Sequence, residues 1–355
     1  MSASSPLPII PELPPSAADD YEFKFVGEGA SNVVFEVIVQ PHDESSRNLF
    51  QWNLLRVPKA GTKAHTYGEL IQYWETVVKP LFEPEDLVQH QLVGLGGDAV
   101  VARLNEVLEK EDDTRRVDFR GSRVAKAGYG LLVEDMRQRH PDDLTLEFKP
   151  KWLAQSPNAP ASAIRCRTCA REAFKHHTKP PAPANPTILC ALDYLTCSSS
   201  PPILATILHH LAPSGRRPAP ETPQQQTEQT QQHGQLSRWL QTNTVLPRLR
   251  AAQLANDRTG PLGADAHDAQ FQLAMTLRDC TCFVRIPADP SAPVEAKLAD
   301  LDKKNWAAKL GYWQATERRL IEGGYYAGTE VPRQETDCQL ERVAKGAGEG
   351  GKGEV

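Results

Sequence analysis

The chain has 355 residues, of which 40% are apolar, and its formal net charge is −5. The length predicts two to three domains of about 100–200 residues each, and the low apolar fraction with 29 prolines predicts disordered inserts. The sequence contains no run of apolar residues long enough to predict a membrane-spanning helix. Its N-terminus lacks the basic region and apolar stretch of a signal peptide, so none is expected. Seven scattered cysteines, an odd number, favour free thiols in a reducing compartment.

The first half of the chain alternates between strand and helix signals. Residues 1–16 are rich in Ser and Pro and are expected to form a loose arm. Runs rich in β-branched residues predict strands, and apolar residues at helical spacing predict helices. Strands are expected at 21–39 (two, joined by a turn at 27–32), 50–57, 130–136 and, as the neighbour of 130–136, 144–148; helices are expected at 66–79 and 98–109.

The second half contains more loop and low-complexity signals. Proline content predicts a loop at 176–189, and the Pro- and Gln-rich stretch at 213–235 is expected to be a disordered insert. A helix is expected from Leu236 to Leu254, broken or kinked at Pro247. The remaining predictions are a hairpin at 283–301, a helix at 305–322 and a frayed end at 343–355.

Basic charge is concentrated in one segment of this acidic protein. Residues 147–179 contain seven Lys or Arg but only two acids, Glu147 and Glu172. Such a concentration indicates a local anion site rather than a general affinity for nucleic acid. A solvated basic face is the alternative. The cations are Lys149, Lys151, Arg165, Arg167, Arg171, Lys175 and Lys179.

A glycine turn, Gly27-Glu28-Gly29, joins the first two expected strands. Glycines let backbone N–H groups approach nucleotide phosphates, although an ordinary hairpin turn also contains them. The turn lacks the Lys and Ser/Thr of a Walker loop and is closer to the strand–loop–strand lid of kinase-like folds. Arg56, near the end of the next strand, would face the phosphates in such a lobe, or is a plain surface cation.

Aspartates flank the expected hairpin. Asp279 precedes it, and Asp300 and Asp302 lie at its far end. Kinase-like phosphotransferases need one carboxylate to accept the proton of the acceptor hydroxyl and another to hold Mg²⁺. The hairpin would bring both to one place. The His-Arg-Asp and Asp-Phe-Gly motifs of an ordinary protein kinase are absent from the sequence.

Cys166 and Cys169 form a Cys-x-x-Cys pair that suggests zinc. A structural zinc site needs four ligands, commonly a second pair of Cys or His. His176 and His177 follow, but they adjoin each other beyond a basic, helix-like stretch. Thiols without a metal are therefore favoured, and no thioredoxin-like pattern supports a redox pair.

These motifs together are similar to those of the inositol-pentakisphosphate 2-kinase family, in particular of its fungal members. The glycine turn is generic, whereas the Glu-x-Lys-Pro-Lys block followed by Arg-x-Cys is specific. The resemblance covers about residues 21–326. In chain order, the matching segments are Gly27 to Asn32, Leu55 to Lys59, Glu147 to Trp152, Arg165 to Cys169, Arg278 to Thr281 and Ala299 to Lys304.

The resemblance implies an α+β fold with two lobes: a protein-kinase-like N-lobe with a β-sheet and glycine loop, and an enlarged mixed C-lobe. The expected parts are an arm at 1–16, an N-lobe at 17–135, a C-lobe at 136–330 and a flexible tail at 331–355, with the active site between the lobes. The implied reaction moves the γ-phosphate of ATP, with Mg²⁺, to the 2-hydroxyl of inositol 1,3,4,5,6-pentakisphosphate, giving inositol hexakisphosphate (phytate). A monomer in the nucleus or cytoplasm is expected, with no need for nucleic acid or membrane.

The resemblance also implies site residues on the nucleotide side. The glycine turn would cover the ATP phosphates, Arg56 would contact them, and a hinge at 134–136 would lie beside the adenine. Glu147 matches an acid on the nucleotide side. The implied ATP-binding residues are Gly27, Glu28, Gly29, Ala30, Ser31, Asn32, Arg56, Glu134, Met136 and Glu147.

On the acceptor side, the resemblance implies Asp279 as general base, Lys149 as a catalytic cation and Asp300 as the Mg²⁺ ligand. Arg171 stands where the family usually has a His, and the His/Cys zinc ligands of plant members are not found here. The implied substrate-binding residues are Lys149, Lys151, Arg167, Arg171, Lys175, Lys304, Tyr312 and Arg120, with Arg116 as the alternative to Arg120.

The charge of the substrate agrees with this hypothesis. Five phosphates carry about −8 to −10 charges, at about −1.5 to −2 each, and Lys and Arg can neutralise them through charge-assisted hydrogen bonds. Two alternatives are another kinase-like phosphotransferase acting on a less charged molecule and a catalytically inactive protein that binds inositol polyphosphates. A basic zinc-binding nucleic-acid module would need more ligand pairs and interleaved aromatic residues.

Overall fold

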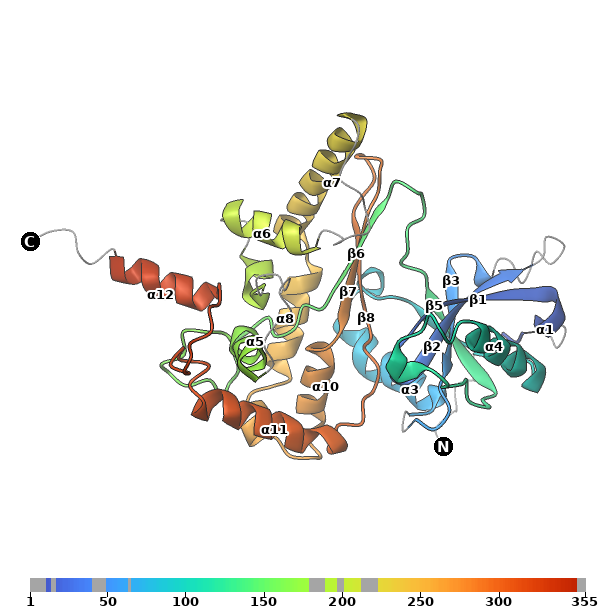
Figure 1. The fold of residues 1–355 in the computed structure, drawn as a ribbon, viewed down its shortest axis with the longest axis horizontal. Coiled ribbons are helices and arrows are strands. Elements are labelled where there is room, and N and C mark those ends of the chain that lie inside the picture. The colour runs from blue at the N-terminus through green and yellow to red at the C-terminus, as the bar shows by residue number, and fades with distance from the viewer. Residues whose placement is uncertain are drawn as a thin grey trace, which may run out of the picture. The chain divides into compact units, whose positions relative to one another are not determined.

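The computed structural model describes residues 11–13, 17–39, 49–62, 65–178, 189–196, 201–211 and 223–349. Within these ranges the protein is a mixed α+β structure with two separate sheets (Figure 1). It divides into two compact units. Unit 1 comprises residues 1–80, 88–135 and 302–305, and unit 2 comprises residues 81–87, 136–301 and 306–355.

The sheet of unit 1 is antiparallel, in the order β1–β2–β3–β5–β4. Alternation of apolar and polar residues produces it, because one face of each strand packs on the core. Val33, Phe35 and Val37 on β2 are buried, whereas the residues between them are only half-buried. The strands are β1 Tyr21–Glu28, β2 Asn32–Val39, β3 Asn53–Pro58, β4 His90–Gly94 and β5 Tyr129–Glu134.

Helix α4, Asp98–Lys110, lies beside β1 in unit 1 (Figure 1). Its buried residues Val100, Val101, Leu104 and Leu108 recur at helical spacing and therefore form one apolar face against the sheet. The other helical segments of this part of the chain are α1 Ala17–Asp20, α3 Tyr67–Tyr73, a π-helical turn η1 Trp74–Val78, and the 3₁₀ turns η2 Lys79–Leu81, η3 Pro84–Asp86 and η4 Val117–Phe119.

Two expectations for unit 1 are corrected. Part of the expected loose arm is ordered, since Glu12 bridges to Gly94 and Leu13 is fully buried; residues 1–10 and 14–16 lie outside the described residues. Strand β4 was not predicted, because its short sequence has only two buried positions, Val93 and Gly94. The two strands at 21–39, the strand within 50–57 and the strand within 130–136 are confirmed.

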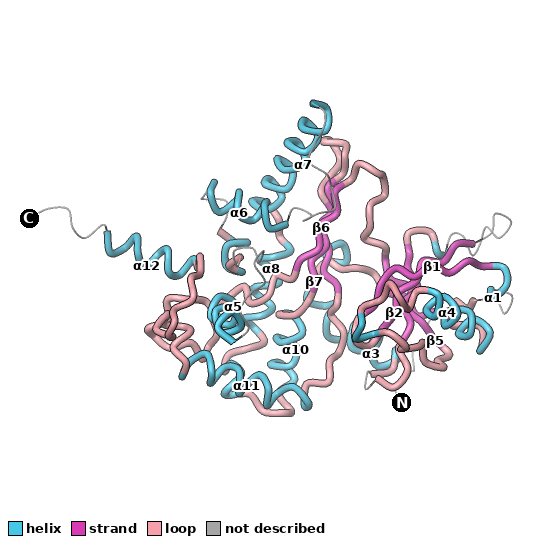
Figure 2. Tube along the Cα trace, viewed as in Figure 1, coloured by secondary structure: helices cyan, strands magenta, loops and turns pink. Residues whose placement is uncertain are grey.

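The sheet of unit 2 is antiparallel in the order β6–β7–β8, visible as magenta strands among helices in Figure 2. Its strands are β6 Leu144–Phe148, β7 Thr281–Ile286 and β8 Glu295–Ala299. The predicted hairpin of β7 and β8 is confirmed. The expectation that 144–148 pairs with 130–136 was wrong: β6 pairs with β7, far along the chain, and β5 pairs with β3 and β4.

Helices make up most of the remainder of unit 2 (Figures 1 and 2). Two of them, α5 and α11, carry residues implied as substrate ligands. The helical segments are α5 Arg167–Thr178, a 3₁₀ turn η5 Ala191–Leu195, α6 Pro201–Leu211, α7 Pro223–Thr242, α8 Val245–Ala255, α9 Gly260–Gly263, α10 Ala269–Leu277, α11 Ala307–Glu322 and α12 Gln339–Glu349.

Helix α7 corrects the expected disorder over 213–235 from Pro223 onward; residues 213–222 lie outside the described residues. Glutamine is a good helix former, and tertiary contacts stabilise the helix although its glutamines are polar. Gln232 is buried and donates to the Asp142 carbonyl oxygen at 2.7 Å, and Leu236 and Trp239 are buried on the same helix.

The helices also correct three boundaries. Pro247 lies in the first turn of α8, where a backbone N–H would have no acceptor within the helix, so proline is tolerated there. The helical break lies just before it, between α7 and α8. The expected frayed end is helical as far as Glu349, and residues 350–355 lie outside the described residues. The expected loop at 176–189 begins later, because α5 continues to Thr178; residues 179–188 are not described. The helix predicted at 305–322 is confirmed as α11.

None of the helices among the described residues is both long enough and apolar enough to span a bilayer.

Candidate active site

The sheet of unit 2 brings three charged side chains to one of its ends. β6 ends at Phe148, β7 begins at Thr281 and β8 ends at Ala299, and Thr281 and Ala299 are register partners. Because adjacent strands run in opposite directions, the residues after β6, before β7 and after β8 lie at the same end. These residues are Lys149, Asp279 and Asp300; with Lys151 they form what we call the sheet-end cluster.

Lys149 connects the strands at this end. Its Nζ donates to the Asp279 carbonyl oxygen at 2.8 Å and to Thr281 Oγ1 at 3.3 Å, and it lies 3.0 Å from Asp300 Oδ2. The ammonium group has three protons, so these three contacts use its full donor capacity. The side chain remains 38% exposed, and that of Asp300 46%. The pair is therefore fixed in place but accessible to a ligand.

Lys151 and Asp279 form the second ion pair of the cluster, with Nζ and Oδ1 3.1 Å apart and both side chains over 40% exposed. The backbone at Lys151 is held by Gln253, a buried residue of α8. Gln253 Nε2 donates to the carbonyl oxygens of Lys151 (2.9 Å) and Leu277 (3.2 Å), and its Oε1 accepts from the Leu153 N–H (3.0 Å). Gln253 therefore joins the segment after β6 to the end of α10.

Backbone strain also marks the cluster. Of the described residues other than glycine, those with a positive φ are Trp52, Lys151 (59°) and Asp300 (57°). A side chain makes this region unfavourable, and residues held in it concentrate at active sites and ligand sites. Two of the three positions belong to the sheet-end cluster, which favours a functional role for it.

Helix α5 adds a second group of cations in unit 2, beside Tyr312 of α11. Arg171 Nη2 donates to the Tyr312 hydroxyl at 3.2 Å. This hydrogen bond is the main cause that lowers the pKa of Tyr312, and the charges of Arg171 and Lys175 contribute in the same direction. Arg171 and Lys175 both pair with Glu172, yet their side chains are 33% and 46% exposed. The phenol therefore lies in a positive field that would also attract phosphate.

Arg167 does not fit its implied role as a phosphate ligand. Its side chain is 5% exposed, and its Nε donates to the buried Glu317 carboxylate at 2.7 Å. Its guanidinium carbon also lies over the Trp152 ring, 4.1 Å from the ring centroid, and that of Arg278 lies over the same ring at 3.4 Å. Because the side chain is buried and paired with Glu317, we assign Arg167 to anchoring the segment that carries Lys149 and Lys151.

Two other members of the basic segment lie elsewhere. Arg165 is fully buried and pairs with Glu330 at 2.7 Å. Lys179 lies outside the described residues. The high basic charge of 147–179 thus combines buried structural cations with the exposed cations Lys149, Lys151, Arg171 and Lys175.

The glycine turn of unit 1 is closed by a hydrogen bond from Gly29 N–H to the Asn32 carbonyl oxygen, 2.9 Å long. A Cβ at Gly27 or Gly29 would meet no atom within 4 Å, and Ala30 is exposed, while Ser31 and Asn32 are half-buried. The outer side of the turn therefore has room for a phosphate group. Asn32 Oδ1 accepts from the Tyr67 hydroxyl at 2.9 Å, which fixes the far side of the turn.

Glu28 is directed away from this open side. Its carboxylate is 4% exposed and lies 2.6 Å from both Lys59 Nζ and Arg115 Nη2. Burial alone would raise the pKa of Glu28, but the hydrogen bonds and charges of Arg115 and Lys59 hold it below its usual value. Only the backbone of Glu28 is thus suited to an anion, and its side chain holds the turn to β3 and the segment after α4.

Arg56 on β3 forms a bidentate ion pair with Asp302. The side chain of Arg56 is 14% exposed and that of Asp302 is 17% exposed. Burial alone would raise the pKa of Asp302, but the charge and hydrogen bonds of Arg56, aided by His90 and Lys304, lower it below its usual value. Lys304 is half-buried. Arg56 and Lys304 therefore supply positive charge in unit 1, in part balanced by Asp302.

Arg120 is better suited than Arg116 to contact an anion, because no carboxylate pairs with it among the described residues. Its guanidinium donates only to backbone carbonyl oxygens, of Arg115 (3.2 Å) and Asp113 (2.8 Å), among the described residues. Arg116 instead pairs with Asp118 at 3.3 Å. An arginine that is oriented by carbonyl groups keeps its charge available for an anion.

The segment from Glu134 to Met136 contains the point where the chain passes from unit 1 to unit 2, between Asp135 and Met136. Glu134 Oε2 accepts from the Gln89 N–H at 3.2 Å. Met136 is buried, with its Sδ 3.8 Å from Arg285 Nη2. Glu147, in unit 2, is exposed on β6.

Sequence reasoning missed two residues that organise these sites. Gln253 positions Lys151, but a glutamine on a helix gives no sequence signal for three hydrogen bonds to distant segments. Asp302 was noted only as one of two aspartates at the hairpin end, and its partner Arg56 is 246 residues away.

Comparisons with known proteins identify the family of this chain. The family model described as inositol-pentakisphosphate 2-kinase matches residues 25–319. The chain is 30% identical over 332 residues to the inositol-pentakisphosphate 2-kinase of Yarrowia lipolytica, covering 92% of this chain and 98% of the relative. It is 29% identical over 180 residues to the protein of the same name from Kluyveromyces lactis, covering 50% of each. The chain therefore belongs to the inositol-pentakisphosphate 2-kinase family.

Proposed function

We propose that this protein transfers the γ-phosphate of ATP to the 2-hydroxyl of inositol 1,3,4,5,6-pentakisphosphate, giving inositol hexakisphosphate. The observation that supports this most is the sheet-end cluster: Lys149 and Lys151, each paired with an exposed aspartate, in a chain of this family. Both aligned relatives are named inositol-pentakisphosphate 2-kinase.

The acceptor is assigned to the cations of unit 2. Inositol pentakisphosphate carries about −8 to −10 charges, since each phosphate carries about −1.5 to −2. Lys149, Lys151, Arg171 and Lys175 are 33–46% exposed and can make charge-assisted hydrogen bonds to phosphate oxygens. Their present carboxylate partners would be exchanged for phosphates. The Tyr312 hydroxyl would donate a further hydrogen bond beside Arg171.

Asp279 is the proposed general base. Its carboxylate is 49% exposed and its backbone is fixed by two hydrogen bonds, from its N–H to the Thr276 carbonyl oxygen (3.0 Å) and from Lys149 to its own carbonyl oxygen. As the acceptor oxygen forms a bond to Pγ, its proton passes to the Asp279 carboxylate. The bond between Pγ and the β–γ bridging oxygen breaks, and ADP leaves with the electron pair. Lys149 and Lys151 would stabilise the charge on the transferred group.

The nucleotide is assigned to unit 1, which we infer to be the N-lobe of a two-lobed, kinase-like enzyme. The backbone of the glycine turn would cover the phosphates and Arg56 would contact them. Arg120, or Arg116 in its place, and Lys304 would contribute charge to the acceptor phosphates. The chain near Glu134 and Met136 would lie beside the adenine, with Glu147 on the nucleotide side.

Mg²⁺ is the proposed metal, and the donor chemistry of Asp300 fits it. Mg²⁺ prefers hard oxygen ligands and is usually held by one or two carboxylates together with substrate phosphates. Asp300 offers one half-exposed carboxylate on a strained backbone, 3.0 Å from Lys149 Nζ. When bound, Mg²⁺ would neutralise nucleotide phosphate charge and orient the γ-phosphate.

The test is incubation with ATP, Mg²⁺ and the pentakisphosphate, with products separated by anion exchange. We expect Asp279→Asn to lower kcat by roughly 10²–10⁴-fold, the usual contribution of a general base, with unchanged affinity for the acceptor by calorimetry. Asp265→Asn, at an exposed aspartate of unit 2, is the control. Tight binding without turnover by the native protein would instead support an inactive inositol polyphosphate-binding protein, and preference for a less charged acceptor would support another phosphotransferase.

A further inference from the structure

A buried aromatic ring joins the two chain segments that carry Lys151 and Asp279. Trp152 directly follows Lys151, and Arg278 directly precedes Asp279. The guanidinium carbon of Arg278 lies over the Trp152 ring, 3.4 Å from its centroid, and both residues are at most 5% exposed. One residue away on each segment, Lys151 Nζ lies 3.1 Å from Asp279 Oδ1. The buried contact and the accessible ion pair therefore link the same two segments.

A buried carboxylate orients Arg278. Asp257, in the turn between α8 and α9, pairs with Arg278 Nη1 through Oδ2 and accepts from the Gly260 N–H through Oδ1 at 2.7 Å. Burial lowers the pKa of Arg278 to about 10, and the charge of Asp257 opposes this change. The guanidinium is therefore still charged at neutral pH, and a charged guanidinium is attracted to the face of an indole ring.

The Trp152 ring also belongs to an apolar cluster that it shares with α10 and α11. Phe271 and Met275 of α10 are buried in this cluster, and Trp313 of α11 packs against it, with its ring centroid 5.9 Å from that of Phe271. Trp313 directly follows Tyr312, which is assigned to the acceptor phosphates. Three buried or half-buried residues of this region are thus each next in the chain to a residue of the proposed site.

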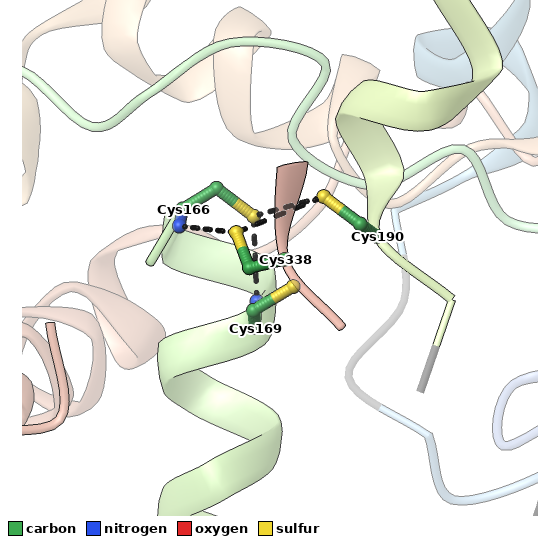
Figure 3. A group of neighbouring side chains, drawn as sticks. All are labelled: Cys166, Cys169, Cys190 and Cys338. Carbon is green, nitrogen blue, oxygen red and sulfur yellow. Dashed lines mark hydrogen bonds between the residues drawn. The ribbon is translucent and has the colours of Figure 1, made fainter. Parts of the chain in front are cut away.

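The second cation at the ring, Arg167, belongs to a segment that is anchored separately. It begins α5, between Cys166 and Cys169, whose sulfur atoms lie within 4.8 Å of those of Cys190 and Cys338 (Figure 3). Neither chain neighbour of Arg167 is part of the sheet-end cluster. Of the two cations at the ring, Arg278 is therefore the one that can act directly on that cluster.

We propose that Arg278 and Trp152 are positioning residues that set the separation of Lys151 and Asp279, with Asp257 orienting Arg278. This inference rests on the proposed function, in which Asp279 is the general base and Lys151 stabilises the transferred group. A buried ion pair contributes little stability compared with well-packed apolar residues of similar volume. Its position next to the proposed base therefore favours a role in the geometry of the site.

The first test is Arg278→Lys, which keeps a charge opposite Asp257 but loses the planar group over the ring. We expect kcat to fall by about 10²-fold, the loss associated with a misplacement of about 1 Å, while the Kd for inositol 1,3,4,5,6-pentakisphosphate changes by less than about threefold. The kcat is expressed per chain that binds the acceptor in calorimetry, so that unfolded chains do not count.

Arg285→Lys is the matched control. Arg285 is also buried and pairs with a carboxylate, that of Glu295, at 2.7 Å, but it lies at the other end of β7 from the sheet-end cluster. This variant should keep the native kcat. A native kcat in Arg278→Lys, or equal losses in the two lysine variants, would overturn the proposal.

A double variant tests whether Arg278 acts through its neighbours. Residues that act through one another give non-additive effects, so the loss of kcat in Arg278→Lys with Lys151→Met should be at least about tenfold smaller than the product of the two single losses. Losses that multiply would show that Arg278 acts independently of the Lys151–Asp279 pair and would contradict the proposal.

A crystal structure of Arg278→Lys tests the inference without turnover. The separation of Lys151 Nζ and Asp279 Oδ1 should increase from 3.1 Å by about 1 Å or more, and an unchanged separation would overturn the proposal. Failure of the native protein to phosphorylate the pentakisphosphate would instead contradict the proposed function.

Trp152→Phe is the milder variant, and it decides if Arg278→Lys is insoluble. Phenylalanine keeps a ring for Arg278 but attracts a cation less strongly than tryptophan, so kcat should fall by roughly tenfold, with acceptor affinity retained. A native kcat in Trp152→Phe would overturn the proposal. Unfolding of both variants would assign the contact to the stability of the fold and would overturn it as well.

Discussion

Lys149 Nζ lies 3.0 Å from Asp300 Oδ2 and also donates to the Asp279 carbonyl oxygen, so one ammonium group connects the ends of β6, β7 and β8. The lysine is thus held in place before any ligand binds. A fixed cation stabilises developing charge without the cost of reorganising in the transition state. This preorganisation gives Lys149 a larger expected effect than a mobile surface lysine.

We expect Lys149→Met to lower kcat by about 10²–10³-fold, comparable to the loss of one preorganised donor at an oxyanion, and to raise the KM for the inositol phosphate. Lys79→Met is the matched control, because Lys79 has similar exposure (44%) and also pairs with a carboxylate. Steady-state kinetics with both variants measure the effect. Equal, small losses in both would remove Lys149 from the catalytic residues.

A second prediction concerns Gln253, which we expect to act through Lys151. Gln253→Leu leaves the part-buried Lys151 and the buried Leu277 carbonyl oxygens without their shared donor, and an unpaired buried group costs about 1–3 kcal/mol of stability. Misplacement of Lys151 should also lower kcat/KM by at least about tenfold, or ~1.4 kcal/mol.

The control for Gln253 is Gln232→Leu. Gln232 is also a buried helical glutamine of unit 2 that donates to a loop carbonyl oxygen, that of Asp142, away from the cluster. Both variants should lose stability in thermal unfolding, whereas only Gln253→Leu should lose catalytic efficiency. A parallel loss of activity in the two would mean that Gln253 acts only on the stability of the fold.

The local features of the fold could be predicted from the sequence, and the long-range pairings could not. The glycine turn and the β7–β8 hairpin each join neighbouring strands, so turn residues and apolar patterns were sufficient. β6 pairs with β7, more than 130 residues later, and no local pattern carries that information. The burial of Arg167 depends on Glu317 and Trp152, which only the tertiary structure brings to it.

Arg167 gives a third prediction, one of stability. Removing one partner of a buried ion pair leaves an uncompensated charge and typically costs about 3–5 kcal/mol, so Arg167→Met should destabilise unit 2 by an amount in this range. Glu317 would keep its bonds from Ser156 Oγ and the Tyr326 hydroxyl, both under 2.8 Å, but lose its cation. Denaturant unfolding measures the change.

Arg103→Met serves as the comparison, because Arg103 pairs with Glu106 on the surface of α4 and such pairs contribute about 0–1 kcal/mol. Adding Glu317→Gln to Arg167→Met should recover part of the loss, since the buried charge is then removed. A cost for Arg167→Met no larger than that for Arg103→Met would show that the guanidinium is not needed to balance Glu317.

The last prediction is a pH dependence of stability that arises from His90, the first residue of β4. Its ring lies against Trp74 at 4.5 Å between centroids. Burial lowers the pKa of His90 to about 4; the charge of Asp302 opposes this and that of Arg56 adds to it. In the unfolded chain the pKa is about 6.5, so the unfolded state binds the proton first as the pH falls. The stability contributed by neutral His90 is complete above about pH 6.5 and is lost progressively between that pH and about 4. We expect a loss of about 2 kcal/mol between pH 7 and pH 5 from this group, measured by urea unfolding at each pH.

His90→Gln should flatten the dependence of the unfolding free energy on pH over this range, because glutamine does not titrate. His267→Gln, at an exposed histidine, should leave this dependence unchanged. Profiles of the same slope for the native protein and His90→Gln would mean that His90 is not kept neutral by the fold.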